Sequence, residues 1–121
     1  MSFKRFLSVT AFTLASAATS SAFAHAKLQS SDPQTGSTLA AAPKQVRLKF
    51  NEALEPAFSK ITLTGPQNNE IPVTATTVDK ADPTVMTAPL PALSTGEYHI
   101  QWSTMTHDGH KAKGEVTFKV K

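Results

Sequence analysis

The chain has 121 residues, of which 12 are Lys or Arg, nine are Asp or Glu and none is Cys. A chain of this length builds one small domain, and it cannot hold a nucleotide-binding domain beside a substrate domain. The lack of cysteine excludes disulfides, thiolate metal sites and cysteine nucleophiles. The net charge of +3 falls to +1 once Lys4 and Arg5 leave with the N-terminal segment described next, so the charge does not indicate nucleic-acid binding.

Residues 1–24 have the three parts of a secretory signal peptide. Lys4 and Arg5 form the positive region, residues 6–18 form the apolar stretch, and Ala22-Phe23-Ala24 places small residues where a signal peptidase reads them. The competing interpretation is a retained membrane anchor, but the apolar run is shorter than the roughly 20 residues that span a bilayer. We therefore expect cleavage after Ala24, export to a bacterial periplasm, and a mature chain of residues 25–121 that does not insert into a membrane.

The mature chain alternates apolar and polar residues with period two, whereas helical periodicity is nearly absent. Turn signals rich in Pro, Gly, Asn and Asp separate the alternating runs. About seven short strands without intervening helices predict an all-β fold, a small antiparallel β-sandwich with immunoglobulin-like Greek-key connections. In chain order, the strands are expected near residues 27–30, 45–50, 61–63, 71–75, 85–88, 98–102 and 116–120.

The segment after the sixth predicted strand is dense in groups that bind metals. In extended chain Asp108 and His110 point to one side and His107 points away, and Gly109 lets the backbone bend between them. A D-x-H pair alone is a weak signal, because Asp108 could instead be a turn-forming aspartate before Gly109.

Cleavage after Ala24 strengthens the metal interpretation, because the mature chain would begin with His25. Its free α-amine and imidazole can close a chelate ring on one metal ion, which an internal histidine cannot do. Together with Asp108 and His110 this gives three nitrogen ligands and one carboxylate. Such a set suits Cu(II) in tetragonal geometry, with Ni(II) and Zn(II) as weaker competitors.

The sequence contains a set of motifs: His25-Ala26-Lys27-Leu28, Ser31-Asp32-Pro33, Leu48-Lys49-Phe50-Asn51-Glu52, Gly96-Glu97-Tyr98, Trp102 and Asp108-Gly109-His110. Together these motifs resemble the CopC/PcoC family of periplasmic copper-binding proteins. The resemblance implies a copper-binding Greek-key β-sandwich over residues 25–121, with one Cu(II) per chain held by His25, Asp108 and His110. It also implies that Glu52 lies next to these ligands without binding the metal itself. The implied role is copper homeostasis, resistance or delivery, with a CopD-like inner-membrane protein as a partner.

One departure from that family concerns methionine. Better-known members hold Cu(I) in a methionine-rich loop between two middle strands. The corresponding residues 64–70 contain neither Met nor His here, and the mature chain has only Met86 and Met105. Because Cu(I) selects soft thioether ligands, we expect no Cu(I) site and a family member of the single Cu(II)-site type.

The preferred interpretation is therefore a monomeric copper-binding protein and not an enzyme. One alternative is a copper-dependent oxidative enzyme with a histidine brace, since such enzymes also begin with histidine. They present a broad substrate surface, however, and this chain has few aromatic residues to spare for one. A third interpretation is a metal-free interaction sandwich, which predicts that alanine at Asp108 and His110 leaves copper affinity unchanged.

Overall fold

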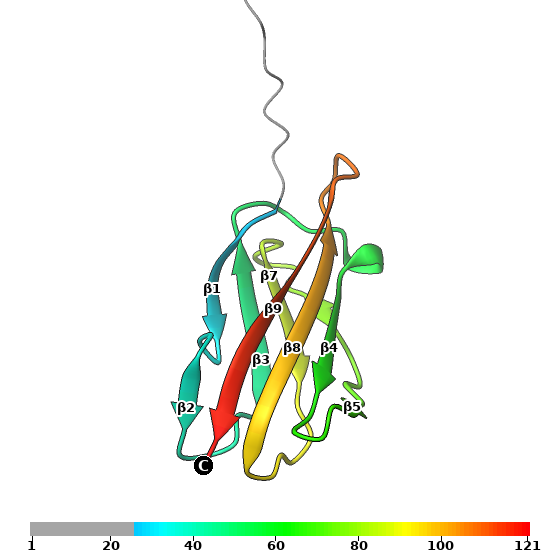
Figure 1. Ribbon diagram of the computed structural model, residues 1–121. Coiled ribbons are helices and arrows are strands. Elements are labelled where there is room, and N and C mark those ends of the chain that lie inside the picture. Colours follow the sequence, from blue (N-terminus) through cyan, green and yellow to red (C-terminus); the bar gives the residue numbers. More distant parts are fainter. Residues whose placement is uncertain (1–25) are drawn as a thin grey trace, which may run out of the picture.

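The computed structural model describes residues 26–121, so the predicted signal peptide and His25 lie outside the described residues. Residues 26–121 form nine strands and one short 3-10 turn, with no α-helix among them (Figure 1). Nothing in this stretch of chain is a helix of the length and apolar character needed to cross a membrane.

The strands form two sheets that pack face to face, and the chain crosses repeatedly from one sheet to the other (Figure 1). The sheet with order β1-β3-β7-β6 consists of β1 (Leu28–Asp32), β3 (Gln45–Phe50), β7 (Val85–Pro89) and β6 (Thr77–Val78). The sheet with order β2-β9-β8-β4-β5 consists of β2 (Ser37–Leu39), β9 (Lys111–Val120), β8 (Gly96–Met105), β4 (Lys60–Thr64) and β5 (Glu70–Ile71). The 3-10 turn η1 (Pro56–Phe58) precedes β4.

The core lies between the sheets, and most of it comes from the apolar residues that alternate along β3, β4, β8 and the second half of β9. Phe50 and Trp102 meet edge to face with ring centroids 4.9 Å apart, and Tyr98 stacks on Phe118 at 5.3 Å. The two rings of β8, Tyr98 and Trp102, are thus core residues, as their alternation predicts. Other fully buried side chains are those of Val46, Leu48, Leu54, Ile61, Leu63, Val85, Met86, Ile100 and Val116.

The predicted all-β sandwich is confirmed, and three details of the prediction are wrong. There are nine strands, because the short β2 and β6 carry too few apolar residues to show alternation. β2 runs parallel to β9, so the pairing is not wholly antiparallel. The strand expected over 71–75 ends at Ile71, because Pro72 has no N–H to donate, and the Thr76 hydroxyl then accepts the Ile61 N–H at 3.1 Å.

The two ends of the sandwich carry different connections. The β8–β9 hairpin loop, η1 and the chain entering β1 lie at one end, which we call the hairpin end (Figure 1). The β4–β5 turn, the β7–β8 connection and the C-terminus lie at the opposite end (Figure 1). The candidate ligands Asp108 and His110 belong to the hairpin end.

Candidate metal centre

Asp108 and His110 lie in the tight loop that joins β8 to β9. The Thr106 N–H donates to the His110 carbonyl oxygen at 3.0 Å, and the Gly109 N–H donates to the Thr106 carbonyl oxygen at 2.9 Å. Gly109 has φ of +85°, a left-handed conformation that glycine adopts without steric cost. These bonds define a short hairpin loop with glycine at the left-handed position, a common way to connect two antiparallel strands.

The loop brings the two candidate ligands into direct contact. The His110 Nδ1 atom lies 2.8 Å from Asp108 Oδ2, and the hydroxyl of Thr106 donates to Asp108 Oδ1. The Thr106 hydroxyl, followed by His110, lowers the pKa of the Asp108 carboxyl from 3.8 to about 2. Asp108 is therefore a carboxylate at any physiological pH, and its two oxygen atoms are held by its neighbours.

The reason for this contact differs from the sequence argument. That argument assumed extended chain through 104–110, but β8 ends at Met105 and residues 107–108 form a turn. The turn, and not strand parity, places Asp108 beside His110. His107 does point elsewhere, as predicted, because its Nδ1 atom binds the Glu55 carboxylate next to η1.

Glu52 lies beside this loop. A shallow hollow of about 300 Å³ is lined by Glu52 and Ala53 on one side and by Thr106, His107 and Asp108 on the other. Two backbone contacts hold these segments together. Leu54 forms an isolated antiparallel β-bridge with Thr106, and the Glu55 N–H donates to the Met105 carbonyl oxygen at 2.8 Å. Glu52 is half-buried and borders the hollow.

The first described residues are fixed at the same end of the sandwich. Ala26 is only 4% exposed and belongs to the hydrophobic core. The Lys27 N–H donates to the Asn51 side-chain oxygen at 2.7 Å, and the Asn51 N–H donates back to the Lys27 carbonyl oxygen at 3.1 Å. The chain is therefore anchored directly beside Glu52, at the hairpin end.

His25 itself lies outside the described residues, so its position relative to Asp108 and His110 is not tested. Among residues 26–121, no three His, Asp or Glu side chains converge in a way that could hold a metal ion. Of the predicted set, the structure brings together Asp108 and His110 and places Glu52 near them.

Two residues near the loop have no counterpart in the sequence prediction. Thr106 is buried and orients Asp108, and a hydroxyl two residues before an aspartate at a turn is a signal that could have pointed to it. Glu55 binds His107 from 52 residues away along the chain, and no local pattern indicates that contact.

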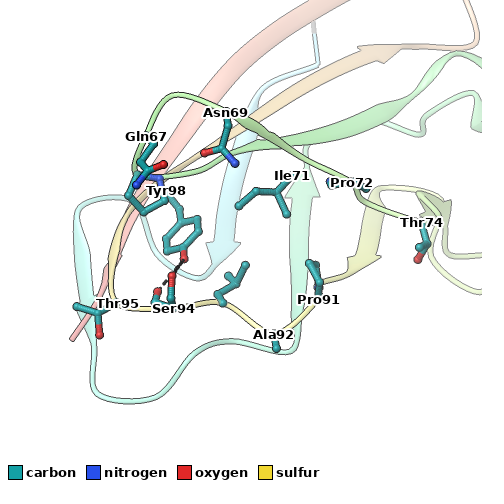
Figure 2. A pocket seen from close by; sticks show the side chains of 12 residues that line it. Gln67, Asn69, Ile71, Pro72, Thr74, Pro91, Ala92, Ser94, Thr95 and Tyr98 are labelled. Atoms are coloured by element: carbon teal, nitrogen blue, oxygen red, sulfur yellow. Dashed lines mark hydrogen bonds between the residues drawn. The ribbon is translucent and has the colours of Figure 1, made fainter.

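A second, larger hollow lies at the opposite end and has different chemistry. Its volume is about 660 Å³, and it lies between the β4–β5 turn and the β7–β8 connection. Figure 2 shows Tyr98 at one side, with its hydroxyl donating to the Ser94 carbonyl oxygen at 2.7 Å. Its lining contains no Asp, Glu, His or Met side chain, so it offers no strong metal ligand.

Comparison with known proteins decides the family. The model of the CopC domain matches residues 28–121. The chain belongs to the CopC family. The family match begins at β1 and ends at the last residue, so it covers every strand of the sandwich.

Individual CopC-family relatives agree with this assignment. Protein YobA from Escherichia coli K12 is 36% identical over 104 residues, which cover 85% of this chain and 84% of YobA. The crystal structure of CopC from Methylosinus trichosporium OB3b has a TM-score of 0.74 at 28% identity and covers 80% of this chain and 94% of that one. PcoC is described as a methionine-rich copper resistance protein from Escherichia coli. Its structure has a TM-score of 0.67 at 37% identity, and the match covers 81% of this chain and 100% of PcoC.

A sequence similar to this chain also occurs as one part of a longer protein. The copper transport protein CutJ from Bacillus subtilis is 31% identical over 99 residues, which are 81% of this chain but 18% of CutJ. The remainder of CutJ lies outside the match.

Proposed function

We propose that this protein is exported, loses residues 1–24, and binds one Cu(II) ion through the α-amine and imidazole of His25, the Asp108 carboxylate and the His110 imidazole. Membership of a family whose members are described as copper resistance proteins supports copper as the cargo. The observation that carries the proposal is the direct contact of Asp108 with His110 in a loop at the end of the sandwich where the chain enters.

The anchoring of Ala26 supports a role for His25. Ala26 is buried in the core at the hairpin end, and it follows His25 directly in the chain. Lys27 is bound to Asn51, and Glu52 borders the same hollow as Asp108. We therefore assign the amine and imidazole of His25 to this end of the sandwich, which carries the other two proposed ligands.

The chemistry of the donor set suits Cu(II). Imidazole and amine nitrogens with one carboxylate oxygen are ligands of intermediate hardness, which Cu(II) binds more strongly than other divalent first-row metals do. Asp108 is already ionised and held by Thr106, so it needs no deprotonation before it binds a cation. Glu52 adds a second carboxylate at the rim, where it would act on the ligands and not on the metal.

We further propose that the protein has no Cu(I) site. Met86 is 0% exposed in the core, and Met105 is half-buried at the hairpin end, far along the chain from the β4–β5 turn. That turn, residues 65–69, contains Pro, Gln and Asn and borders the 660 Å³ hollow. A thioether cluster of the kind that selects Cu(I) cannot be assembled from these residues.

A binding and delivery role in the periplasm, as a monomer, fits these features better than catalysis. The hollow beside Asp108 is only about 300 Å³ and shallow, which leaves little room for an oriented organic substrate. The occurrence of a CopC-like segment within a longer copper transport protein supports a membrane copper transporter, such as a CopD-like protein, as the partner.

The proposal is tested by titrating Cu(II) into protein that begins at His25, followed by electron paramagnetic resonance. A parallel sample carries one extra glycine before His25, which converts the amine to an amide. We expect one tetragonal, nitrogen-rich site in the first sample. Its affinity should fall in the second sample by more than the roughly 10–100-fold that loss of an outer-shell partner costs.

Matched variants separate ligands from neighbours. His110→Ala and Asp108→Ala should each lose most of the copper affinity, whereas His107→Ala should retain it, because His107 binds Glu55 and not Asp108. The proposal would be contradicted if the added glycine or the Asp108→Ala substitution left the copper affinity unchanged. The β8–β9 loop would then be an ordinary hairpin turn. Turnover of a reductant with peroxide by the copper-loaded protein would favour the oxidative enzyme instead.

A further inference from the structure

The surface next to the hairpin end has an exposed aromatic ring. Phe58 is 62% exposed and is the only large hydrophobic side chain of residues 26–121 that is exposed. It ends η1, the green turn that stands beside the end of β8 in Figure 1. The turn is fixed, because the Glu55 N–H donates to Met105, the Ser59 hydroxyl donates to the Glu55 carbonyl oxygen at 2.8 Å, and the Glu55 carboxylate binds His107.

Phe58 borders one of two hollows that adjoin each other on the outer face of the β4-β8-β9 sheet. The first, of about 470 Å³, is lined by Phe58, Met105 and Ala112 with Lys111 and Lys113. The second, also about 470 Å³, shares Ser103 and Lys113 with the first and continues to Lys60. We call this continuous area the Phe58 surface.

The Phe58 surface is positively charged although the mature chain is nearly neutral. Lys60, Lys111 and Lys113 are exposed, and within the described chain none of them forms an ion pair with a carboxylate. The one carboxylate that borders the area, Glu115, is bound to His99. An apolar centre with a charged rim is the arrangement of protein–protein interfaces, and its sign selects partners of opposite charge.

We propose that the Phe58 surface docks an acidic face of a protein partner that exchanges copper with this protein. The hollows favour a protein over a lipid bilayer, because a projecting apolar side chain can fill them and a flat layer of headgroups cannot. The Phe58 surface adjoins the β8–β9 loop through Met105 and Lys111, so a docked partner would lie beside Asp108 and His110. The exchange of copper rests on the proposed function, whereas the docking itself does not.

The test places the photo-crosslinking residue p-benzoylphenylalanine at position 58 of the full chain, expressed in its own host. This residue keeps the aromatic ring of Phe58. Irradiation should give a protein adduct whose contact peptide, identified by mass spectrometry, is acidic. The double variant Lys111→Glu/Lys113→Glu should lower the adduct yield by roughly tenfold or more, because it sets like charges against each other.

The control is Lys44→Glu/Lys80→Glu, which makes the same change in net charge at two exposed lysines outside the Phe58 surface and should keep the yield. When the crosslinking residue replaces the exposed Arg47, which lies on the other sheet, the same adduct should not form. No protein adduct, equal loss in both double variants, an adduct with lipid, or an adduct with a second copy of this chain would each overturn the proposal.

A copper titration of the same variants keeps the two proposals apart. If copper affinity is normal but the adduct yield does not depend on Lys111 and Lys113, the docking proposal is wrong and the proposed function stands. If copper does not bind at all while the charge-dependent adduct forms, the docking surface stands and the copper site is wrong.

Discussion

Thr106→Val should raise the pKa of Asp108 and weaken copper binding without removing any proposed ligand. Thr106 is 2% exposed, and its hydroxyl donates to Asp108 Oδ1 while lying 3.4 Å from the His110 carbonyl oxygen. Valine has the same shape as threonine but no hydroxyl. The substitution therefore removes the hydrogen bond that contributes most to the low pKa of Asp108.

The size of the effect follows from the contacts of Asp108. Its pKa is lowered from 3.8 to about 2, first by Thr106 and then by His110, and the His110 contact at 2.8 Å survives the substitution. We therefore expect the pKa to rise by about one pH unit and to stay below 3.8. Copper affinity should fall about tenfold, as is usual when a ligand loses the group that orients it.

The assay is a titration of the Asp108 carboxyl carbon by NMR across the acidic range, in the metal-free protein. Thr104→Val is the matched control, because Thr104 is also 2% exposed but its hydroxyl reaches Ala112 and not Asp108. A pKa that stays near 2 in Thr106→Val, or that rises equally in Thr104→Val, would refute the reasoning. Because the pKa of Asp108 is lowered in the folded protein, ionised Asp108 stabilises the fold at neutral pH. This stabilisation is lost as the pH falls through about 2.

Four further predictions concern copper binding and the stability of the fold. Copper affinity should fall as the pH drops from about 8 to about 5, because imidazole and amine must lose protons to bind a metal. Asp108→Asn should lower the affinity by a constant factor over that range, since Asp108 stays ionised until the pH approaches about 2; a flattened pH dependence in competition titrations would contradict this. Copper at a hundredfold excess over Kd should raise the melting temperature by about 11–22 °C, and His110→Ala should lose most of that rise in differential scanning calorimetry. Gly114→Ala should destabilise the fold by about 1–3 kcal/mol or more, because the new Cβ would lie 2.4 Å from Trp102 Cζ2; unchanged urea unfolding would show that the ring can move aside.

The fold class could be predicted from the sequence because alternation is a local property. Each long run, such as residues 45–50, buries every second residue, and that pattern needs no knowledge of the neighbouring strand. The short strands could not be found in this way. β2 exists because it pairs in parallel with the last strand, and β5 ends early because Pro72 breaks the ladder. The β2–β9 pairing joins residues about 80 positions apart, such as Ser37 and Phe118.

The sequence by itself determined which groups are available to bind a metal: a histidine that cleavage would expose, a D-x-H pair, and no thiol or methionine cluster. Only the tertiary structure decided how those groups are held. The hairpin turn with its left-handed glycine sets Asp108 against His110, and the buried Thr106 fixes the charge of Asp108. The anchoring of Ala26, the contact of Glu55 with His107 and the exposure of Phe58 likewise come from segments far apart in the chain. Because these last three features join segments that are distant in the chain, no local pattern of residue types encodes them.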